Sequence, residues 1–121
     1  MSNLSVTVII PSVRNHEELD VVLKGLSNQT YSGPYKIVVV GPTNDPGSAV
    51  CEENNIQFID DEGSRTRADA CNIAINATES ELILFTDDDV IVPKDWVEKL
   101  VSWFTREEVS GVGGPNFAPI E

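Results

Sequence analysis

Three consecutive carboxylates, Asp87, Asp88 and Asp89, are the residues whose types and spacing best suit chemistry. Adjacent negative charges repel one another, which is a cost that a purely structural loop would normally avoid. Mg²⁺ or Mn²⁺ would offset this repulsion, because both ions prefer oxygen ligands. In extended backbone Asp87 and Asp89 face one side and Asp88 faces the other. The competing interpretation is a solvated acidic turn that caps the next helix.

Two of the eight basic residues, Arg65 and Arg67, precede a predicted helix. Helix N-termini and guanidinium groups both favour phosphate, so this segment is a candidate phosphate contact. Equally, each arginine could pair with a nearby acid such as Asp60, Asp61 or Glu62. The glycines match neither a P-loop nor Gly-x-Gly-x-x-Gly, which leaves no glycine-rich phosphate loop in the sequence.

The elements that must position these residues alternate between strands and helices. Runs of β-branched residues predict buried strands at 6–10, 35–40, 56–59 and 81–86, and a fifth strand is expected at 109–112. Helical spacing predicts helices at 16–28, with Asn15 as N-cap, at 47–54, at a segment that ends near 77, and from Pro93 to about Phe104. This order predicts an α/β fold in which helices flank a mostly parallel sheet.

Ligands of such sheets bind beyond the carboxyl ends of the strands. Three segments occupy that position in this sequence: Pro11-Ser12-Val13, Gly41 to Gly47, and Asp87 to Asp89. We therefore expect the functional site to be built from these segments.

Composition and charge exclude several classes of protein. The chain has 121 residues, which suits one domain, and 20 acidic against 8 basic residues give a net charge of −12. Such a surface repels phosphate backbones and anionic lipid, so no nucleic-acid partner is expected. No apolar run reaches the roughly 18 residues of a membrane span, and the N-terminus does not resemble a signal peptide.

The two cysteines, Cys51 and Cys71, form no Cys-x-x-Cys motif and lie near no His cluster. A thiolate metal site and a disulfide framework are therefore not expected. We expect both thiols to pack as small apolar groups in a reduced compartment, which predicts a cytoplasmic location.

An ordered set of segments resembles the family 2 glycosyltransferases, which have the Rossmann-like GT-A fold. The resemblance covers nearly the whole chain. Five segments match, in chain order. They are the opening strand, the end of the first helix, the second strand, a helix similar to Ala-Arg-Asn-x-Gly-Ile, and a strand followed by an Asp-x-Asp signature. These matches lie in 6–12, 26–31, 35–40, 70–75 and 81–93.

The resemblance implies a nucleotide-diphospho-sugar donor (a UDP-, GDP- or dTDP-sugar) and a divalent metal, Mg²⁺ or Mn²⁺. In the family the Asp-x-Asp carboxylates contact the donor ribose and the metal. This role maps onto Asp87 and Asp89, and Asp88 shares the donor contact. The segment after the first strand lies against the nucleotide, which maps onto the donor-binding candidates Pro11, Ser12 and Val13.

Two positions depart from the family pattern. The acidic pair after the second strand, whose first acid reads the base, is replaced by Gly41 and Pro42. Discrimination among UDP, GDP and dTDP is then expected to be weak unless Asp45 reaches the base, and Gly41→Asp is expected to strengthen UDP binding more than GDP binding. The family arginine before Asn72 is Cys71 here, and Arg67, one helical turn earlier, would supply the lost charge to the donor.

Family members continue into an acceptor-binding half that carries the catalytic base. The sequence contains no such half, so 1–121 is expected to be a single donor-binding domain, and no catalytic base is assigned. The function implied is the donor-binding portion of a glycosyltransferase, and the alternative is a catalytically idle nucleotide- or metal-binding fragment. A third interpretation, a phosphoacceptor signalling domain, requires acids after the first strand, where Pro11 and Ser12 stand.

The last predicted helix carries more apolar residues than one face can bury. Trp103 falls outside the face formed by Val97, Leu100, Val101 and Phe104. Apolar surface left exposed tends to associate, so a homo-oligomer is expected.

Overall fold

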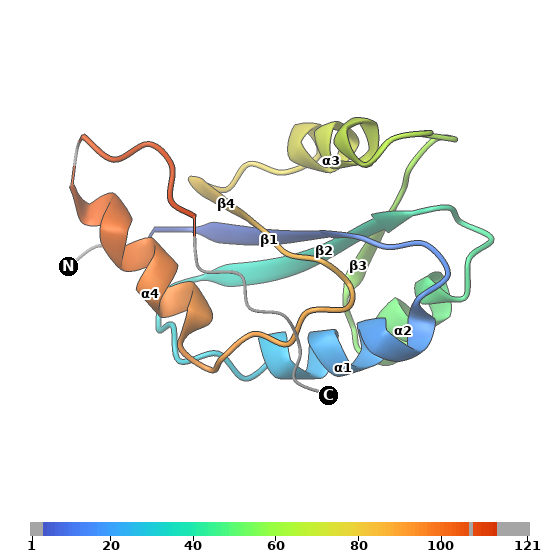
Figure 1. Cartoon of the computed structure of the whole chain (residues 1–121), viewed down its shortest axis with the longest axis horizontal. Helices are drawn as coiled ribbons and strands as arrows, with labels where there is room; N and C mark the ends of the chain where they lie inside the picture. Colours follow the sequence, from blue (N-terminus) through green and yellow to red (C-terminus); the bar gives the residue numbers. More distant parts are fainter. Residues whose placement is uncertain (1–3, 107, 114–121) are drawn as a thin grey trace.

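A four-stranded, fully parallel sheet forms the centre of the protein (Figure 1). In this computed structural model of the chain, the residues described are 4–106 and 108–113. The strands follow the spatial order β3-β2-β1-β4, with bounds β1 (Val6–Pro11), β2 (Tyr35–Gly41), β3 (Gln57–Asp60) and β4 (Leu82–Phe85). The predicted α/β fold with a parallel sheet is confirmed.

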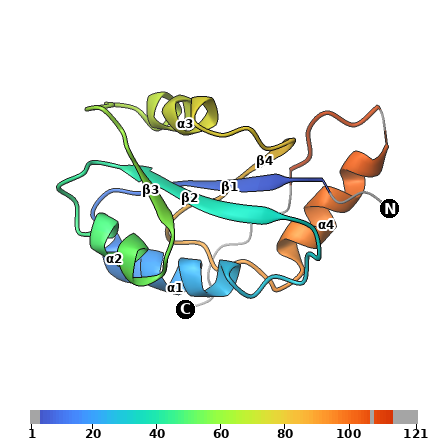
Figure 2. The same cartoon turned by 180° about the vertical axis from the view of Figure 1, so that it is seen from behind.

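Helices cover both faces of this sheet. Helices α1 (His16–Leu26), α2 (Gly47–Glu53) and α4 (Trp96–Ser102) lie on one side, and α3 (Arg67–Asn76) lies on the other (Figures 1 and 2). A short 3-10 helix, Trp103–Thr105, continues from α4. Among the described residues, no helix has the length and apolar character needed to cross a membrane.

The β-branched runs of the strands supply two apolar cores, because successive side chains of a strand face opposite sides. Val8 and Val39 belong to the core under α1, α2 and α4, whereas Ile9 and Val38 belong to the smaller core under α3. A sheet covered on both faces needs near-continuous apolar strands, and this requirement explains the sequence pattern.

Helix α1 presents one apolar stripe to the larger core. Its buried residues follow helical spacing, and its charges fit the helix dipole, with acids in the first turn and Lys24 in the last. The buried residues are Leu19, Val22, Leu23 and Leu26.

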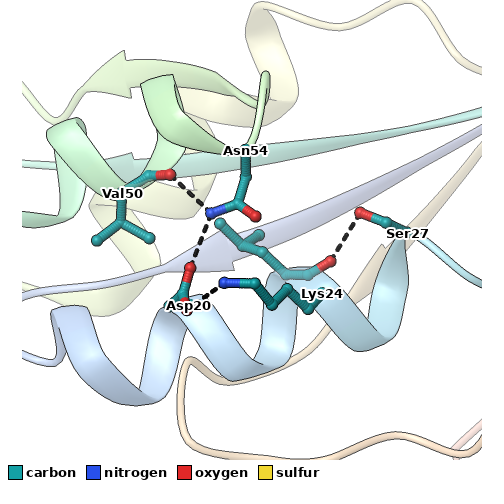
Figure 3. Close-up of polar contacts among 6 residues, drawn as sticks. Asp20, Lys24, Ser27, Val50 and Asn54 are labelled. Atoms are coloured by element: carbon teal, nitrogen blue, oxygen red, sulfur yellow. Dashed lines mark hydrogen bonds and ion pairs between the residues drawn. The ribbon is translucent and has the colours of Figure 1, made fainter.

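A polar contact joins α1 to the end of α2 (Figure 3). The Asn54 amide donates to Asp20 Oδ1 and to the Val50 carbonyl, both at 2.9 Å. Hydrogen bonds from Lys24 and then Asn54 lower the pKa of Asp20. Because the folded-state pKa is lowered, this contact stabilises the fold above the usual Asp pKa and is lost as the pH falls below it.

Both cysteines are free thiols, and Cys51 is fully buried against the larger core. Burial raises the pKa of Cys51 to about 11, so this thiol stays protonated at neutral pH. The expectation that Cys51 packs as a small apolar group is confirmed.

The fifth strand expected at 109–112 is wrong, because this segment forms no strand. The Val109 N–H instead donates to the Arg106 carbonyl at 3.2 Å in a turn. Gly111 and Gly113 bring no side chains to pack against a sheet, and glycine has the highest entropic cost of extension. The last helix also begins at Trp96, three residues after Pro93, with Asp95 in the N-cap position.

Candidate functional site

The carboxyl ends of the strands place the predicted segments along one edge of the sheet. The Ser12 N–H donates to the Val40 carbonyl at 3.0 Å, and the Thr86 N–H donates to the Ile9 carbonyl at 3.3 Å. Figure 2 shows the loops that follow β1, β2 and β3 at the same end of the molecule. The segments after β1 and β4 therefore lie side by side.

Asp88 is the buried member of the carboxylate run. Its Oδ2 accepts from the Ser12 hydroxyl at 2.8 Å, and both of its oxygens accept from the Asn15 amide at 3.1 Å. These bonds tie the turn after β4 to the segment after β1. Asn15 does occupy the N-cap position of α1, but its side chain makes no capping bond and serves Asp88 instead.

The side chains of Asp87, Asp88 and Asp89 point in different directions, but strand alternation is not the cause. β4 ends at Phe85 and a turn begins at Asp88, so the backbone is not extended across the run. Asp88 turns inward because Ser12 and Asn15 bind it, whereas Asp89 is exposed and has no hydrogen bond or ion pair to any described residue.

Asp87 forms an ion pair with Arg67, the first residue of α3. Its Oδ1 is buried and, apart from this ion pair, accepts no hydrogen bond from the described residues. Burial raises the pKa of Cys71, Arg67 opposes that rise and Asp87 adds to it, so all three groups lie within electrostatic range. Arg67 therefore holds a positive charge next to the position where the family has its arginine.

The carboxylates fit a metal that is shared with a substrate, but they do not form a closed protein cage. Within the described ranges, no group of three or more His, Cys, Asp or Glu side chains could hold a metal ion. Mg²⁺ typically takes only one or two protein carboxylates and completes its shell with water and phosphate. Asp87, whose Oδ1 is paired with Arg67, and Asp89, whose carboxylate has no hydrogen bond or ion pair to any described residue, provide that number of carboxylates.

A cavity of about 230 Å³ lies between the end of β1 and the start of α3. Its lining includes four of the predicted donor-binding residues and three polar residues for which the sequence analysis proposed no ligand contact. The predicted members are Pro11, Ser12, Val13 and Arg67, and the added members are Asp61, Ser64 and Thr66; Arg65, a candidate phosphate contact, lines it as well. Asp61 directly follows β3, much as Asp87 follows β4 by two residues. This position at the end of a strand is the feature of the sequence that could have identified Asp61 as a candidate.

Arg67 also lines a larger cavity of about 560 Å³, which runs along β4 and α4 and includes Asp87. The ion pair of Arg67 and Asp87 thus stands where the two cavities approach each other.

Gly41 and Asp45 are not among the described residues that line the smaller cavity. A Cβ atom on Gly41 would lie 2.3 Å from the Ser12 carbonyl oxygen, so the backbone leaves no room for a side chain. An aspartate introduced by Gly41→Asp would therefore require the backbone at Ser12 to move. Asp45 is buried, and its two oxygens accept from the Arg14 N–H at 2.8 Å and the Gly47 N–H at 2.9 Å, which ties the loop after β2 to the segment after β1.

Comparison with known proteins identifies the family. The model of glycosyl transferase family 2 matches residues 7–120, and the chain belongs to this family. Among curated proteins, an N-acetylglucosaminyltransferase of Azorhizobium caulinodans is 34% identical over 117 residues, which cover 90% of this chain and 30% of that protein.

Solved structures share the fold. A mannosyltransferase from Pyrobaculum calidifontis, in complex with GDP-Man and Mn²⁺, matches with a TM-score of 0.78 and 23% identity over 86% of this chain and 33% of its own. Glucosyl-3-phosphoglycerate synthase from Mycobacterium tuberculosis, in complex with Mn²⁺, UDP and glucosyl-3-phosphoglycerate, matches with a TM-score of 0.73 and 14% identity over 84% of this chain and 39% of its own. The chain thus spans about a third of these proteins, and the GT-A fold is confirmed.

Proposed function

We propose that this domain binds a nucleotide-diphospho-sugar donor together with Mg²⁺ or Mn²⁺, as the donor-binding portion of a glycosyltransferase. The observation that carries the proposal is the meeting of Asp87, Arg67 and the segment after β1 at one sheet edge. Family membership and the ligands named for the two similar structures, GDP-Man and UDP with Mn²⁺, support it. Transfer to an acceptor is proposed for the protein to which this domain belongs.

The site suits the electrostatics of glycosyl transfer. Breaking the bond between the anomeric carbon and the diphosphate leaves negative charge on the leaving group. When bound by Asp87 and Asp89 of the proposed Asp-x-Asp motif, the divalent metal supplies Lewis-acid stabilisation of that charge. Arg67 can donate to a phosphate oxygen from the N-terminus of α3, and Asp88 fixes the turn that carries its two neighbours.

Asp89→Asn tests the metal role. In calorimetry, the unchanged chain is expected to bind a nucleoside diphosphate at least about 10-fold more tightly with Mn²⁺ than with EDTA. The variant is expected to lose that difference while its unfolding curve stays unchanged, because Asp89 is exposed and makes no internal contact in the described structure.

Asp69→Asn is the matched control, since it removes the same charge from an exposed site on α3 outside the described cavity lining. It should keep the full Mn²⁺ effect. If the unchanged chain binds the nucleoside diphosphate equally well with Mn²⁺ and with EDTA, the metal proposal is wrong. Donor hydrolysis by the purified chain separates a transferase portion from the alternative of a catalytically idle binding domain.

We also propose that the domain self-associates. Phe85, Val90, Ile91 and Trp103 are exposed apolar side chains on β4, on the segment that follows it and after α4, and Ile91 is 79% exposed. Exposed Trp103 lies outside the buried face of α4, as its sequence position predicted, with the Arg106 guanidinium 5.5 Å from its ring centre. Sedimentation at high micromolar concentration is expected to show a dimer or larger species, and Ile91→Lys should shift it toward monomer. A clean monomer of the unchanged chain contradicts this proposal.

A cytoplasmic location is a further proposal. The free thiols of Cys51 and Cys71 support it, because compartments that keep thiols reduced favour unpaired cysteines.

A further inference from the structure

We propose that Asp61 reads the nucleobase of the donor and that the base it selects is uracil or thymine. This inference rests on the proposed donor site and assigns its base specificity. Asp61 would supply the carboxylate that Gly41, at the end of the neighbouring strand, cannot carry.

The position of Asp61 follows from the pairing of β2 with β3. Gly41 lies opposite Asp60 in the register, and the Asp61 N–H donates to the Gly41 carbonyl at 2.9 Å. A carboxylate on Gly41 itself is excluded, because its Cβ would lie 2.3 Å from the Ser12 carbonyl oxygen. At this part of the sheet edge, an acid is therefore accommodated at the end of β3 and not at the end of β2.

The Asp61 carboxylate is buried but only partly satisfied. The residue is 6% exposed and lines the cavity of about 230 Å³ together with the segment after β1. Its Oδ1 accepts from the Gly63 N–H at 3.1 Å, and its Oδ2 has no partner among the described residues. This Oδ2 atom keeps access to solvent, so an N–H group of a ligand in the cavity can bond to it.

Arg65 gives the same cavity a hydrogen-bond donor. This exposed residue lines the cavity, and its guanidinium forms no ion pair with any described residue, although Asp60, Asp61 and Glu62 are close in sequence. The residues that line the cavity therefore include one carboxylate with an unpaired oxygen and one arginine without an ion pair. The matching ligand edge carries an N–H beside a carbonyl oxygen.

Uracil and thymine carry that edge, because N3–H stands between two carbonyl groups. Cytosine has an unprotonated N3, which would set a lone pair against Asp61 Oδ2. Guanine has N1–H beside a carbonyl, but its amino group adds a second donor that must share Oδ1 with the Gly63 N–H, so we expect guanine to bind less tightly than uracil.

The first test uses the unchanged chain and modified nucleotides. With Mn²⁺ present, calorimetry should give UDP and dTDP affinities at least about 10-fold higher than those of CDP, GDP and N3-methyl-UDP, because only the first two offer a matching N–H. N3-methyl-UDP binding as tightly as UDP, or a preference for GDP, overturns the inference and leaves the proposed donor site intact. Absence of binding by every nucleoside diphosphate overturns both.

The second test is Asp61→Asn. In this variant the Gly63 N–H still donates to the side-chain oxygen, so the amide N–H₂ faces the cavity. That N–H₂ group cannot accept from N3–H of uracil, but it can donate to the unprotonated N3 of cytosine. The affinity ratio of UDP to CDP is expected to fall about 10-fold or more. The control Asp60→Asn removes the same charge from an exposed side chain that accepts only the Glu62 N–H at 3.3 Å, and it should leave the ratio unchanged. An unaltered ratio of UDP to CDP affinity in a folded Asp61→Asn variant contradicts the role of Asp61 in base recognition. If that variant does not fold, the comparison of N3-methyl-UDP with UDP decides.

Discussion

Gly41→Ala is expected to lower the free energy of unfolding by about 3 kcal/mol. The new Cβ would lie 2.3 Å from the Ser12 carbonyl oxygen, which is a backbone atom and cannot rotate away. The adjacent bond from the Ser12 N–H to the Val40 carbonyl, 3.0 Å long, holds the end of β1 beside β2, so relief requires the two strands to part. Urea unfolding followed by circular dichroism measures the change.

Gly25→Ala is the matched control, because a Cβ there meets no atom within 4 Å and the position lies in α1. Alanine in a helix is favoured over glycine, so this variant should gain about 0.5–1 kcal/mol. If Gly41→Ala proves as stable as Gly25→Ala, the close approach of β1 and β2 is not a constraint, and the argument against an acid at Gly41 fails with it.

Asp88→Ala is expected to cost about 3 kcal/mol of stability and to weaken nucleotide binding. The change removes the acceptor of the Ser12 hydroxyl and of the Asn15 amide, which are bonds of 2.8 and 3.1 Å to a buried charged group. Hydrogen bonds to charged groups are worth about 1.5–3 kcal/mol each, and the two partners are left unsatisfied. The turn that carries Asp87 and Asp89 would also lose its anchor to β1.

Asp89→Ala provides the comparison at the next residue. It removes a carboxylate that is exposed and unbonded within the described structure, so stability should stay within about 0.5 kcal/mol of the unchanged chain, while the Mn²⁺ effect disappears. Asp88→Ala should show the opposite pattern, with a large loss of stability. Equal unfolding curves for the two variants would refute the division of roles between these neighbours.

The sequence was sufficient to predict most of the fold because local composition and burial agree. The runs Val6–Ile10 and Tyr35–Val40 are β-branched, and the sheet buries both of their faces, so the predicted strands are correct to within a residue or two. The prediction failed at 109–112, where two valines suggested a strand but the segment follows a turn and forms none. A strand is defined by its neighbour, and local composition does not contain that information.

The sequence was sufficient to predict which segments form the site, but not the separate role of each carboxylate. The acidic run after β4 and the segment after β1 both stood out, because each follows a buried strand. The inward turn of Asp88 depends on Ser12 and Asn15, which lie more than seventy positions away in the chain. The lack of space at Gly41 and the half-satisfied carboxylate of Asp61 likewise arise only when β1, β2 and β3 pack side by side.

Paramagnetic broadening of amide signals tests the central claim most directly, because Mn²⁺ reports its own position. Mn²⁺ and a nucleoside diphosphate would be added to the ¹⁵N-labelled chain and the loss of each amide signal recorded, with Mg²⁺ as the diamagnetic reference. We expect the signals at Ser12, Arg67 and Asp87 to Asp89 to disappear first, and we expect Asp89→Asn to restore them. Broadening centred on other acids, such as Glu52 and Glu53, or spread evenly over the acidic surface, would contradict it.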